Sequence, residues 1–410
     1  MSVKSRKDSP EQAEFRAYCA KWLEENRPPK PDFRMPQSAL EVMDDAQRVY
    51  LQNWQKQCYD AGLVGCDYPA EYGGGGKKDL QRIANEEMKR AKTPFLIQAI
   101  GLGMVAPTIL THGTEEQKKR YIPKVLSGEE IWCQGFSEPG AGSDLANVQS
   151  VAEKKGDKWI INGHKVWTTL GHVAQFMILL ARHDKSDKYK GLTYFLIPIE
   201  GHPGVSVRPL IKMTGETGFN EVLFEDAEIP DSMRLDEVGK GWDVAMTTLL
   251  HERGAGGLVP PGAGGAGMGS ETVGRSAWEL VGLAKECKRG GRPASEDPIL
   301  RDKIVESIIN ETAIRQNARR MRVPALNDHP MRLNMQLKLL TTEHPQRVGE
   351  IGLEIQGQRS TLYIGDENAP ADGRWPLAYM NTYGSTIAGG TSEVQRNILG
   401  ERVLGMPKSK

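Results

Sequence analysis

Short β-rich segments between residues 131 and 240 interrupt a chain whose pattern is otherwise helical, and this change of pattern limits the possible folds. The segments are rich in β-branched and aromatic residues, and turn signals such as Lys155–Asp157 and Asn162–Gly163 separate them. They comprise Val151–Ile161, Phe176–Arg182, Leu192–Ile199 and Val205–Pro209. The sequence therefore predicts a β module at 131–240.

The flanking parts of the chain have apolar residues at helical spacing. At 410 residues the chain is too long for one compact core. We therefore expect an α+β multidomain fold: an N-terminal α-helical domain (1–130), a middle β-barrel or sandwich domain (131–240), and a C-terminal four-helix-bundle-like domain (241–410). The predicted helices are Glu11–Glu25, Leu40–Ala61, Trp242–Glu252, Ile299–Met321 and Glu393–Leu404.

Charge and composition exclude several classes of protein. Lysine plus arginine (53) equals aspartate plus glutamate (53), which argues against a broadly basic nucleic-acid binder. No apolar run approaches the ~20 residues that span a bilayer, and the N-terminus lacks the apolar region of a signal peptide. The five cysteines include no Cys-x-x-Cys pair, so we expect no disulfide framework, no metal site and a cytoplasmic location. Cys133 is interpreted as a small buried hydrophobe, with a reactive thiol as the alternative.

A glycine-rich segment, Gln134–Asp144, combines glycines with small hydroxyl residues. Such a segment lets backbone N–H groups approach a phosphate or a ring edge closely. A tight loop without a ligand is the alternative interpretation.

Two further segments suit the same chemistry. In Asn162–Thr169, an aromatic plane and two hydroxyls can pack against an isoalloxazine ring, although Trp167 in a buried core is the alternative. In Thr386–Arg396, Thr391 or Ser392 is a candidate N-cap before an apolar helical run, and such helix N-termini bind anions.

The three segments together resemble the acyl-CoA dehydrogenase family, and the resemblance covers nearly the whole chain. Ser137–Asp144 resembles its flavin and substrate signature, Ile161–Thr169 its second flavin segment, and Gly389–Arg396 with Glu401–Gly405 its C-terminal signature. The resemblance implies FAD as cofactor, acyl-CoA as substrate and electron-transfer flavoprotein as electron acceptor. The implied FAD-binding residues are Gln134, Phe136, Ser137, Ser143, Trp167, Thr169, Gly390, Thr391 and Glu393, and the implied substrate-binding residues are Ser143, Arg253 and Gly389.

The position of the catalytic base departs from the commonest family pattern. In many members the base is a glutamate immediately before Gly-Thr-Ser, where this chain has Gly389, which cannot accept a proton on a side chain. Branched-chain and some long-chain members use a glutamate from an earlier helix, in a Glu-Arg pair that matches Glu252 and Arg253. The resemblance therefore implies Glu252 as the base, with a solvated ion pair as the alternative. The Gly389 N–H remains able to polarise the thioester carbonyl.

Two segments that family homotetramers usually supply to a neighbouring flavin site are not evident. They are Arg-x-x-Phe-Gly, expected near Arg289–Pro293, and Gln-x-x-Gly-Gly-x-Gly, expected near Ile355–Gln358. Either other contacts hold FAD in a homo-oligomer (a dimer or tetramer), or the chain is half of an α2β2 heterotetramer with a related subunit. The glycine-rich stretch Gly254–Gly274 is interpreted as a loop at the pocket mouth or an opening for bulky acyl groups, with a surface insertion as the alternative.

Three functions follow from these residues. The first is FAD-dependent α,β-desaturation of an acyl-CoA thioester, with Glu252 removing the α-proton and flavin N5 accepting the β-hydride. The second is a flavin-dependent monooxygenase or oxidase of the same fold, a class that typically lacks the catalytic carboxylate. The third is a structural partner subunit in a heteromeric dehydrogenase. The placement of the base favours branched or bulky acyl groups.

Overall fold

The computed structural model describes residues 8–36, 41–42, 44–252, 275–320, 323 and 333–408. The chain forms two compact units, Met1–Lys212 with Glu216–Gly264, and Met213–Gly215 with Gly265–Lys410. Arg253 and the predicted glycine-rich loop Gly254–Gly274 lie outside the described residues. The division into three domains at 130 and 240 stays a prediction.

The first unit begins with helices whose N-termini are capped by side chains. Ser9 and Gln12 form a capping box at the first helix, and Thr114 and Gln117 form another at the fifth. Asp44 caps the second helix, so this helix begins later than the predicted Leu40. The helices are α1 (Pro10–Asn26), α2 (Asp45–Asp60), α3 (Leu80–Ala91), the π-helix η2 (Gly101–Val105), α4 (Ala106–His112) and α5 (Glu115–Ser127).

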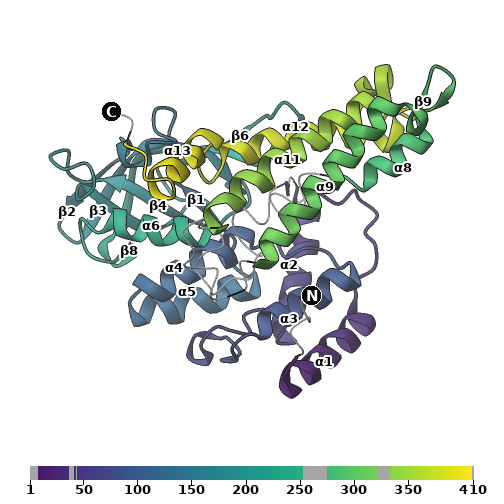
Figure 1. Cartoon of the computed structure of the whole chain (residues 1–410). Coiled ribbons are helices and arrows are strands. Elements are labelled where there is room, and N and C mark those ends of the chain that lie inside the picture. The colour runs from purple at the N-terminus through teal and green to yellow at the C-terminus, as the bar shows by residue number, and fades with distance from the viewer. Residues whose placement is uncertain are drawn as a thin grey trace. The chain divides into compact units, whose positions relative to one another are not determined.

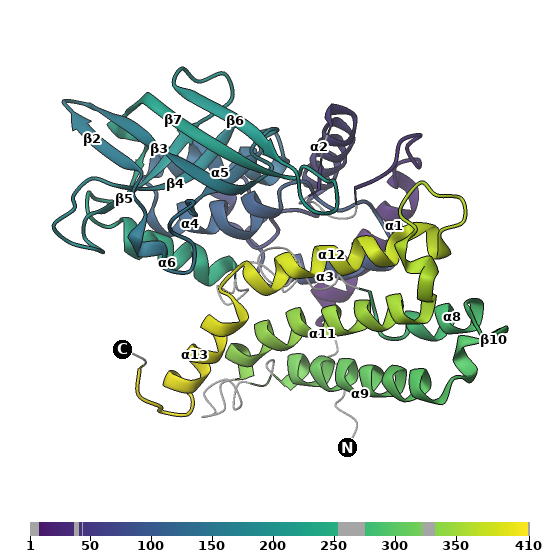
Figure 2. The same ribbon diagram turned by 90° about the horizontal axis from the view of Figure 1, so that it is seen from above.

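The predicted β module is an eight-stranded sheet, seen in Figure 1 with β2 and β3 together and in Figure 2 with β6 and β7 beside them. Its order is β6-β7-β3-β2-β4-β5-β8, and β1 pairs with β4 in parallel. The strands are β1 (Trp132–Gly135), β2 (Val151–Lys155), β3 (Lys158–Thr169), β4 (Phe176–Arg182), β5 (Leu192–Pro198), β6 (Val205–Leu210), β7 (Phe219–Pro230) and β8 (Arg234–Leu235). The strand β7, which pairs with both β3 and β6, was not predicted.

One turn assignment from the sequence was wrong. Lys155–Asp157 does form the turn between β2 and β3, where Gly156 has φ +66°. Asn162–Gly163 instead lies inside β3, where the pairing with β7 shifts between Ile161 and Gly163. Gly163 is required there because a Cβ would lie 2.2 Å from Ser150 Oγ.

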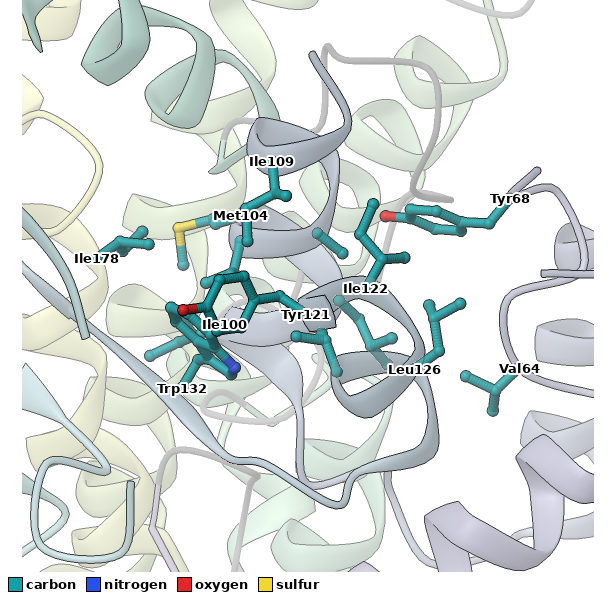
Figure 3. Packing of buried hydrophobic residues seen from close by; sticks show 14 of the residues in the cluster. Val64, Tyr68, Ile100, Met104, Ile109, Tyr121, Ile122, Leu126, Trp132 and Ile178 are labelled. Carbon is teal, nitrogen blue, oxygen red and sulfur yellow. The ribbon is translucent and has the colours of Figure 1, made fainter. Parts of the chain in front are cut away.

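A continuous apolar core joins the helices of the first unit to one face of the sheet. Figure 3 shows Tyr121 and Ile122 of α5 with Trp132 of β1 and Ile178 of β4. The Tyr121 and Trp132 rings meet edge to face, with centroids 5.3 Å apart. Helix α6 (Gly241–Glu252), predicted as the start of the C-terminal domain, clusters with this unit and contacts β5 and α4.

The second unit is a helical bundle, as predicted. Its central helix, α11 (Leu333–Gln356), packs against α8 (Glu279–Glu286), α9 (Pro298–Arg320), α12 (Arg374–Ile387) and α13 (Ser392–Arg402). In both Figure 1 and Figure 2, α9, α11 and α12 run side by side. A short hairpin of β9 (Lys288–Arg289) and β10 (Arg292–Pro293) lies between α8 and α9.

Replacing Gly352 with alanine should destabilise the second unit by about 1–3 kcal/mol, because overpacking forces neighbours apart. A Cβ at Gly352 would lie 2.2 Å from the Trp375 ring, between α11 and α12. Gly282 of α8 is the matched control, because a Cβ there meets no atom within 4 Å. Gly282→Ala should be neutral or stabilising by up to about 1 kcal/mol. Denaturant unfolding of both variants measures this, and an equal effect of the two would contradict the packing argument.

Candidate active site

The segments Gln134–Asp144 and Asn162–Thr169 are here called the first and second cradle segments. The first starts on β1, which is anchored by its parallel pairing with β4. Gly135 allows β1 to lie close to Met177 of β4, because a Cβ at Gly135 would lie 2.2 Å from Met177 Sδ. Gln134 is half-buried and Phe136 is buried, with its ring edge to face against Tyr194 at 5.8 Å. Phe136 is therefore part of the apolar core beneath the segment. Ser137 is half-buried and lies at the surface of the segment.

A buried ion pair holds this segment against β3. Lys165 is fully buried, and its Nζ lies 2.8 Å from Glu138 Oε1 and 3.1 Å from the Phe136 carbonyl oxygen. Glu138 also accepts hydrogen bonds from the backbone N–H groups of Gln149 (2.6 Å) and Ser150 (2.9 Å). Both members of the pair lie in the segments singled out from the sequence, but neither was given a role.

The electrostatics of the pair favour two charges at neutral pH. Burial raises the pKa of Glu138, but the Lys165 ammonium and the hydrogen-bond donors outweigh it, so the pKa lies below the ordinary 4.5. Burial lowers the pKa of Lys165 to about 8, against the opposing effect of the Glu138 carboxylate.

The second cradle segment ends β3 and presents an unusual tryptophan. The Val166 N–H donates to the Ser137 carbonyl oxygen (2.9 Å), which joins the two segments. Trp167 has φ +59°, and its residue surface is 62% exposed. A left-handed backbone at a bulky exposed residue is costly, and such residues concentrate at functional sites. The exposure excludes the buried-core alternative for Trp167.

The loop after Glu138 is a tight turn with an open outer face. The backbones of Glu138 and Ala141 exchange two hydrogen bonds, of 2.9 and 3.1 Å. Gly140 and Gly142 meet nothing where a Cβ would stand, and Ser143 is exposed. Beside the loop is a cavity of about 260 Å³, lined by Glu138, Pro139, Gly140, Asn147, Gln149, Ser150, Gly163 and His164.

The candidate base lies at the end of a helix tied to the same scaffold. Thr248 Oγ1 is 2.9 Å from the Tyr194 hydroxyl and 3.1 Å from Thr108 Oγ1, and all three side chains are fully buried. Glu252 follows Thr248 by one turn and is half-buried. Contacts thus run from Phe136 through Tyr194 to Thr248, on the helix that ends at Glu252.

The third segment, in the second unit, is a capped helix N-terminus. Gly389 (φ +65°) and Gly390 (φ +96°) reverse the chain, and Thr391 caps α13 by accepting from the Val394 N–H. This confirms the predicted N-terminus and selects Thr391 over Ser392 as the cap. Glu393 is exposed, and its own backbone N–H and the Thr391 hydroxyl lower its pKa.

A buried lysine that the sequence did not suggest fixes this glycine turn. Lys338 of α11 is 7% exposed, and its Nζ donates to the Gly390 carbonyl oxygen at 2.6 Å. The Gln395 side chain donates to the Gly389 carbonyl oxygen (3.2 Å). Nothing local distinguishes Lys338 from a surface lysine in the sequence, since its partner is 52 residues away.

The predicted residues fall into two groups, one in each compact unit. In the first unit, the Val166 N–H donates to the Ser137 carbonyl oxygen and so joins the segment of Gln134, Phe136 and Ser137 to that of Trp167 and Thr169, while Ser143 lies on the open loop. The second group, Gly389, Gly390, Thr391 and Glu393, surrounds the α13 N-terminus in the other unit. Cys133 is buried and burial raises the pKa of its thiol, in agreement with the hydrophobic interpretation.

Three family models match the chain: the acyl-CoA dehydrogenase N-terminal domain at residues 9–129, the middle domain at 133–227 and the C-terminal domain at 239–404. The chain belongs to the acyl-CoA dehydrogenase family, and it is an FAD-dependent oxidoreductase that acts on CH–CH groups.

Two of three similar proteins cover nearly the whole length of the chain, and the third covers 60% of it. The acyl-CoA dehydrogenase IpdE1 of Mycolicibacterium smegmatis is 38% identical over 96% of this chain and 98% of its own. Isovaleryl-CoA dehydrogenase of Pongo abelii is 34% identical over 60% of this chain and 57% of its own. The solved Tcur3481-Tcur3483 steroid ACAD has a TM-score of 0.78 at 26% identity, covering 98% of this chain and 99% of that one.

The residues present fit FAD. The exposed face of Trp167 offers a plane for the ring, and the open loop at Gly140 and Gly142 offers backbone N–H groups. Thr168 Oγ1 and Ser392 Oγ are buried without a hydrogen-bond partner in the described part of the chain. The α13 N-terminus can receive a phosphate. The described residues contain no cluster that could hold a metal ion, and no helix among them is long and apolar enough to cross a membrane.

Replacing Lys165 with methionine should destabilise the protein by about 3–5 kcal/mol, because Glu138 is then buried without its counter-charge. Lys158, whose 2.6 Å ion pair with Glu228 is largely exposed, is the control. Lys158→Met should cost less than about 1 kcal/mol. Chemical denaturation measures the free energy of unfolding of both variants. An equal decrease in the two would show that the buried ion pair contributes no more than the exposed one.

The same pair predicts a pH dependence. Because the pKa of Glu138 is lower in the folded protein than its ordinary 4.5, the unfolded chain takes up this proton first as the pH falls. The free energy of unfolding should therefore decrease below pH 4.5. Lys165→Met should reduce this slope, which urea titrations at pH 3.5–7 would measure. An unchanged slope would assign the acid sensitivity to other carboxylates.

Proposed function

We propose that the chain desaturates an acyl-CoA thioester between its α and β carbons, with Glu252 as the base. The single observation that supports this assignment is the path of contacts from Phe136 through Tyr194 and Thr248 to the helix that carries Glu252. Gly389 has no side chain to accept a proton, so the base must come from elsewhere in the chain.

In the proposed reaction, the Glu252 carboxylate removes the α-proton and the α C–H electron pair forms the new double bond. FAD, when bound, supplies the acceptor for the β-hydrogen, which leaves as a hydride. Donors to the thioester oxygen stabilise the developing negative charge, and the Gly389 N–H is the proposed protein donor. Thr248 and Tyr194 keep the end of α6 in place, so that little reorganisation is needed during proton transfer.

The proposed flavin contacts are Gln134, Phe136, Ser137, Ser143, Trp167, Thr169, Gly390, Thr391 and Glu393, with Arg253 and Ser143 on the substrate. The exposure of Trp167 and the helix cap at Thr391 support the proposed flavin contacts of these two residues. Reduced enzyme is proposed to pass its electrons to an electron-transfer flavoprotein in the cytoplasm. The five buried, free thiols support a reducing compartment.

The proposed substrate is a branched or bulky acyl-CoA, and the proposed assembly is a complex with a related subunit. The solved structure at 26% identity is described as a steroid acyl-CoA dehydrogenase, which supports a bulky acyl group. Where the first missing neighbour segment should fall, the chain has the β9–β10 hairpin, in which Gly290 and Gly291 have positive φ. This hairpin supports an α2β2 heterotetramer rather than a homo-oligomer that completes its own flavin sites.

Replacing Glu252 with glutamine should lower the rate of anaerobic flavin bleaching by acyl-CoA at least 10²–10⁴-fold, because a positioned base typically contributes that much. FAD should remain bound, since the change is isosteric. Glu286→Gln is the matched control, because Glu286 also ends a helix but is exposed. Unchanged bleaching by the Glu252 variant would exclude it as the base, and oxygenated product from wild type would favour a monooxygenase.

Expressing the chain alone should give less than one bound FAD per chain. Co-expression with a related subunit should raise the FAD content to the full stoichiometry. Absorbance at the flavin band with native mass measurement tests both the stoichiometry and the assembly. Stoichiometric FAD in a homo-oligomer that bleaches with acyl-CoA would contradict the heteromeric proposal and also exclude a purely structural role.

A further inference from the structure

The end of β3 holds two bulky residues in a conformation that side chains normally avoid. Trp167 has φ +59° and Leu170 has φ +62°, on either side of Thr168 and Thr169. Such a backbone persists only where its surroundings hold it. The Leu170 N–H donates to the Gly218 carbonyl oxygen at 3.0 Å, and the Gly171 N–H reaches the Thr168 carbonyl oxygen only at 3.3 Å, so a shorter contact from another strand adds to the hold on this peptide.

Asn220 of β7 supplies this contact, and it is shorter than the one from Gly171. Asn220 is fully buried and is the cross-strand partner of Thr168. Its Nδ2 donates to the Thr168 carbonyl oxygen at 3.1 Å. Gly171 permits this packing, because a Cβ there would lie 3.2 Å from Asn220 Cβ. A carbonyl oxygen accepts only, so the amide group must face it with its nitrogen.

His172 fixes the second hydrogen of the same amide. Its Nδ1 lies 3.0 Å from Asn220 Nδ2, and its Nε2 lies 2.9 Å from the Val42 carbonyl oxygen. Because the Val42 carbonyl oxygen can only accept a hydrogen bond, the ring proton of His172 must be on Nε2. This leaves Nδ1 as the acceptor for Asn220 Nδ2. Burial lowers the pKa of His172, in keeping with a neutral ring. Both Nδ2 hydrogens are therefore used, and the amide has one orientation.

This arrangement reaches the proposed flavin contact at Thr169. The carbonyl of one residue and the N–H of the next share a rigid plane and point in opposite directions. Fixing the Thr168 carbonyl therefore fixes the direction of the Thr169 N–H, and with it the exit of the chain after Trp167.

We infer that Asn220, oriented by His172, is a positioning residue that holds the Trp167–Leu170 backbone in its flavin-binding conformation. The inference rests on the proposed contacts of Trp167 and Thr169 with the flavin. Neither Asn220 nor His172 touches the reacting atoms in this role.

The test compares Asn220→Asp with wild type in the full-length chain, using two readouts. The carboxylate keeps the shape of the amide but cannot donate to Thr168 at neutral pH. In flavin-free protein, hydrogen exchange of the 166–171 amides should become at least about tenfold faster, because an unmade buried hydrogen bond weakens local structure by about that factor. The dissociation constant of FAD should rise by about tenfold or more, and the flavin absorption band should shift.

Gln81→Leu is the matched control, because Gln81 is also a buried amide that donates to a backbone carbonyl, that of Leu63 at 2.9 Å. It should lose stability without changing exchange at 166–171 or the affinity for FAD. If Asn220→Asp does not fold, His172→Leu removes the orienting acceptor together with the hydrogen bond to the Val42 carbonyl oxygen, and it should show the same changes at smaller size. Unchanged exchange, or faster exchange with unchanged FAD affinity, would overturn the inference. Failure of the proposed reaction is read separately, from Glu252→Gln.

Discussion

The ion pair between Lys165 and Glu138 is the contact on which the candidate site depends. Its two charges and four hydrogen bonds join β3, the segment after β1, and the backbone at Gln149 and Ser150. A buried pair of this kind adds little net stability compared with apolar side chains of the same volume. Its effect is positional, because the charges are satisfied in only one arrangement of these segments. In that arrangement the Ser137 carbonyl oxygen accepts a hydrogen bond from the Val166 N–H, next to the register shift of β3 at Trp167.

Much of the fold could be predicted from local sequence. Phe176–Arg182 was predicted with the bounds that β4 has, because a run of apolar and β-branched residues between turns leaves few alternatives. The strand β7 was missed, since acidic and amide residues interrupt its apolar positions and its strand character comes from pairing with β3 and β6. Asn162–Gly163 has the composition of a turn, but the long pairing of β3 with β7 makes it a bulge.

A feature of the candidate site could be predicted where it depends on residues adjacent in sequence, as the helix cap at Thr391 does. The contacts that hold it were not. Lys165 and Glu138 are 27 residues apart, and Asn220 and Thr168 are 52 residues apart. Such pairs become visible only once the sheet register is known, because pairing across strands decides which polar groups share a buried space. The family resemblance singled out the cradle segments as candidates, whereas the structure shows which contacts hold these segments together.

The left-handed backbone at Gly389 limits how this enzyme can change. A glutamate at this position would restore the commonest family arrangement, but a side chain at φ +65° carries a strain of roughly 1–2 kcal/mol. The neighbouring carbonyls are also held by Gln395 and Lys338 in the present turn. Moving the proposed base from Glu252 to position 389 would therefore need a rebuilt turn as well as a new carboxylate. In evolutionary terms, the exchange of the two base positions is not a single step, and descendants of this chain are expected to retain Glu252, the proposed base, on the earlier helix.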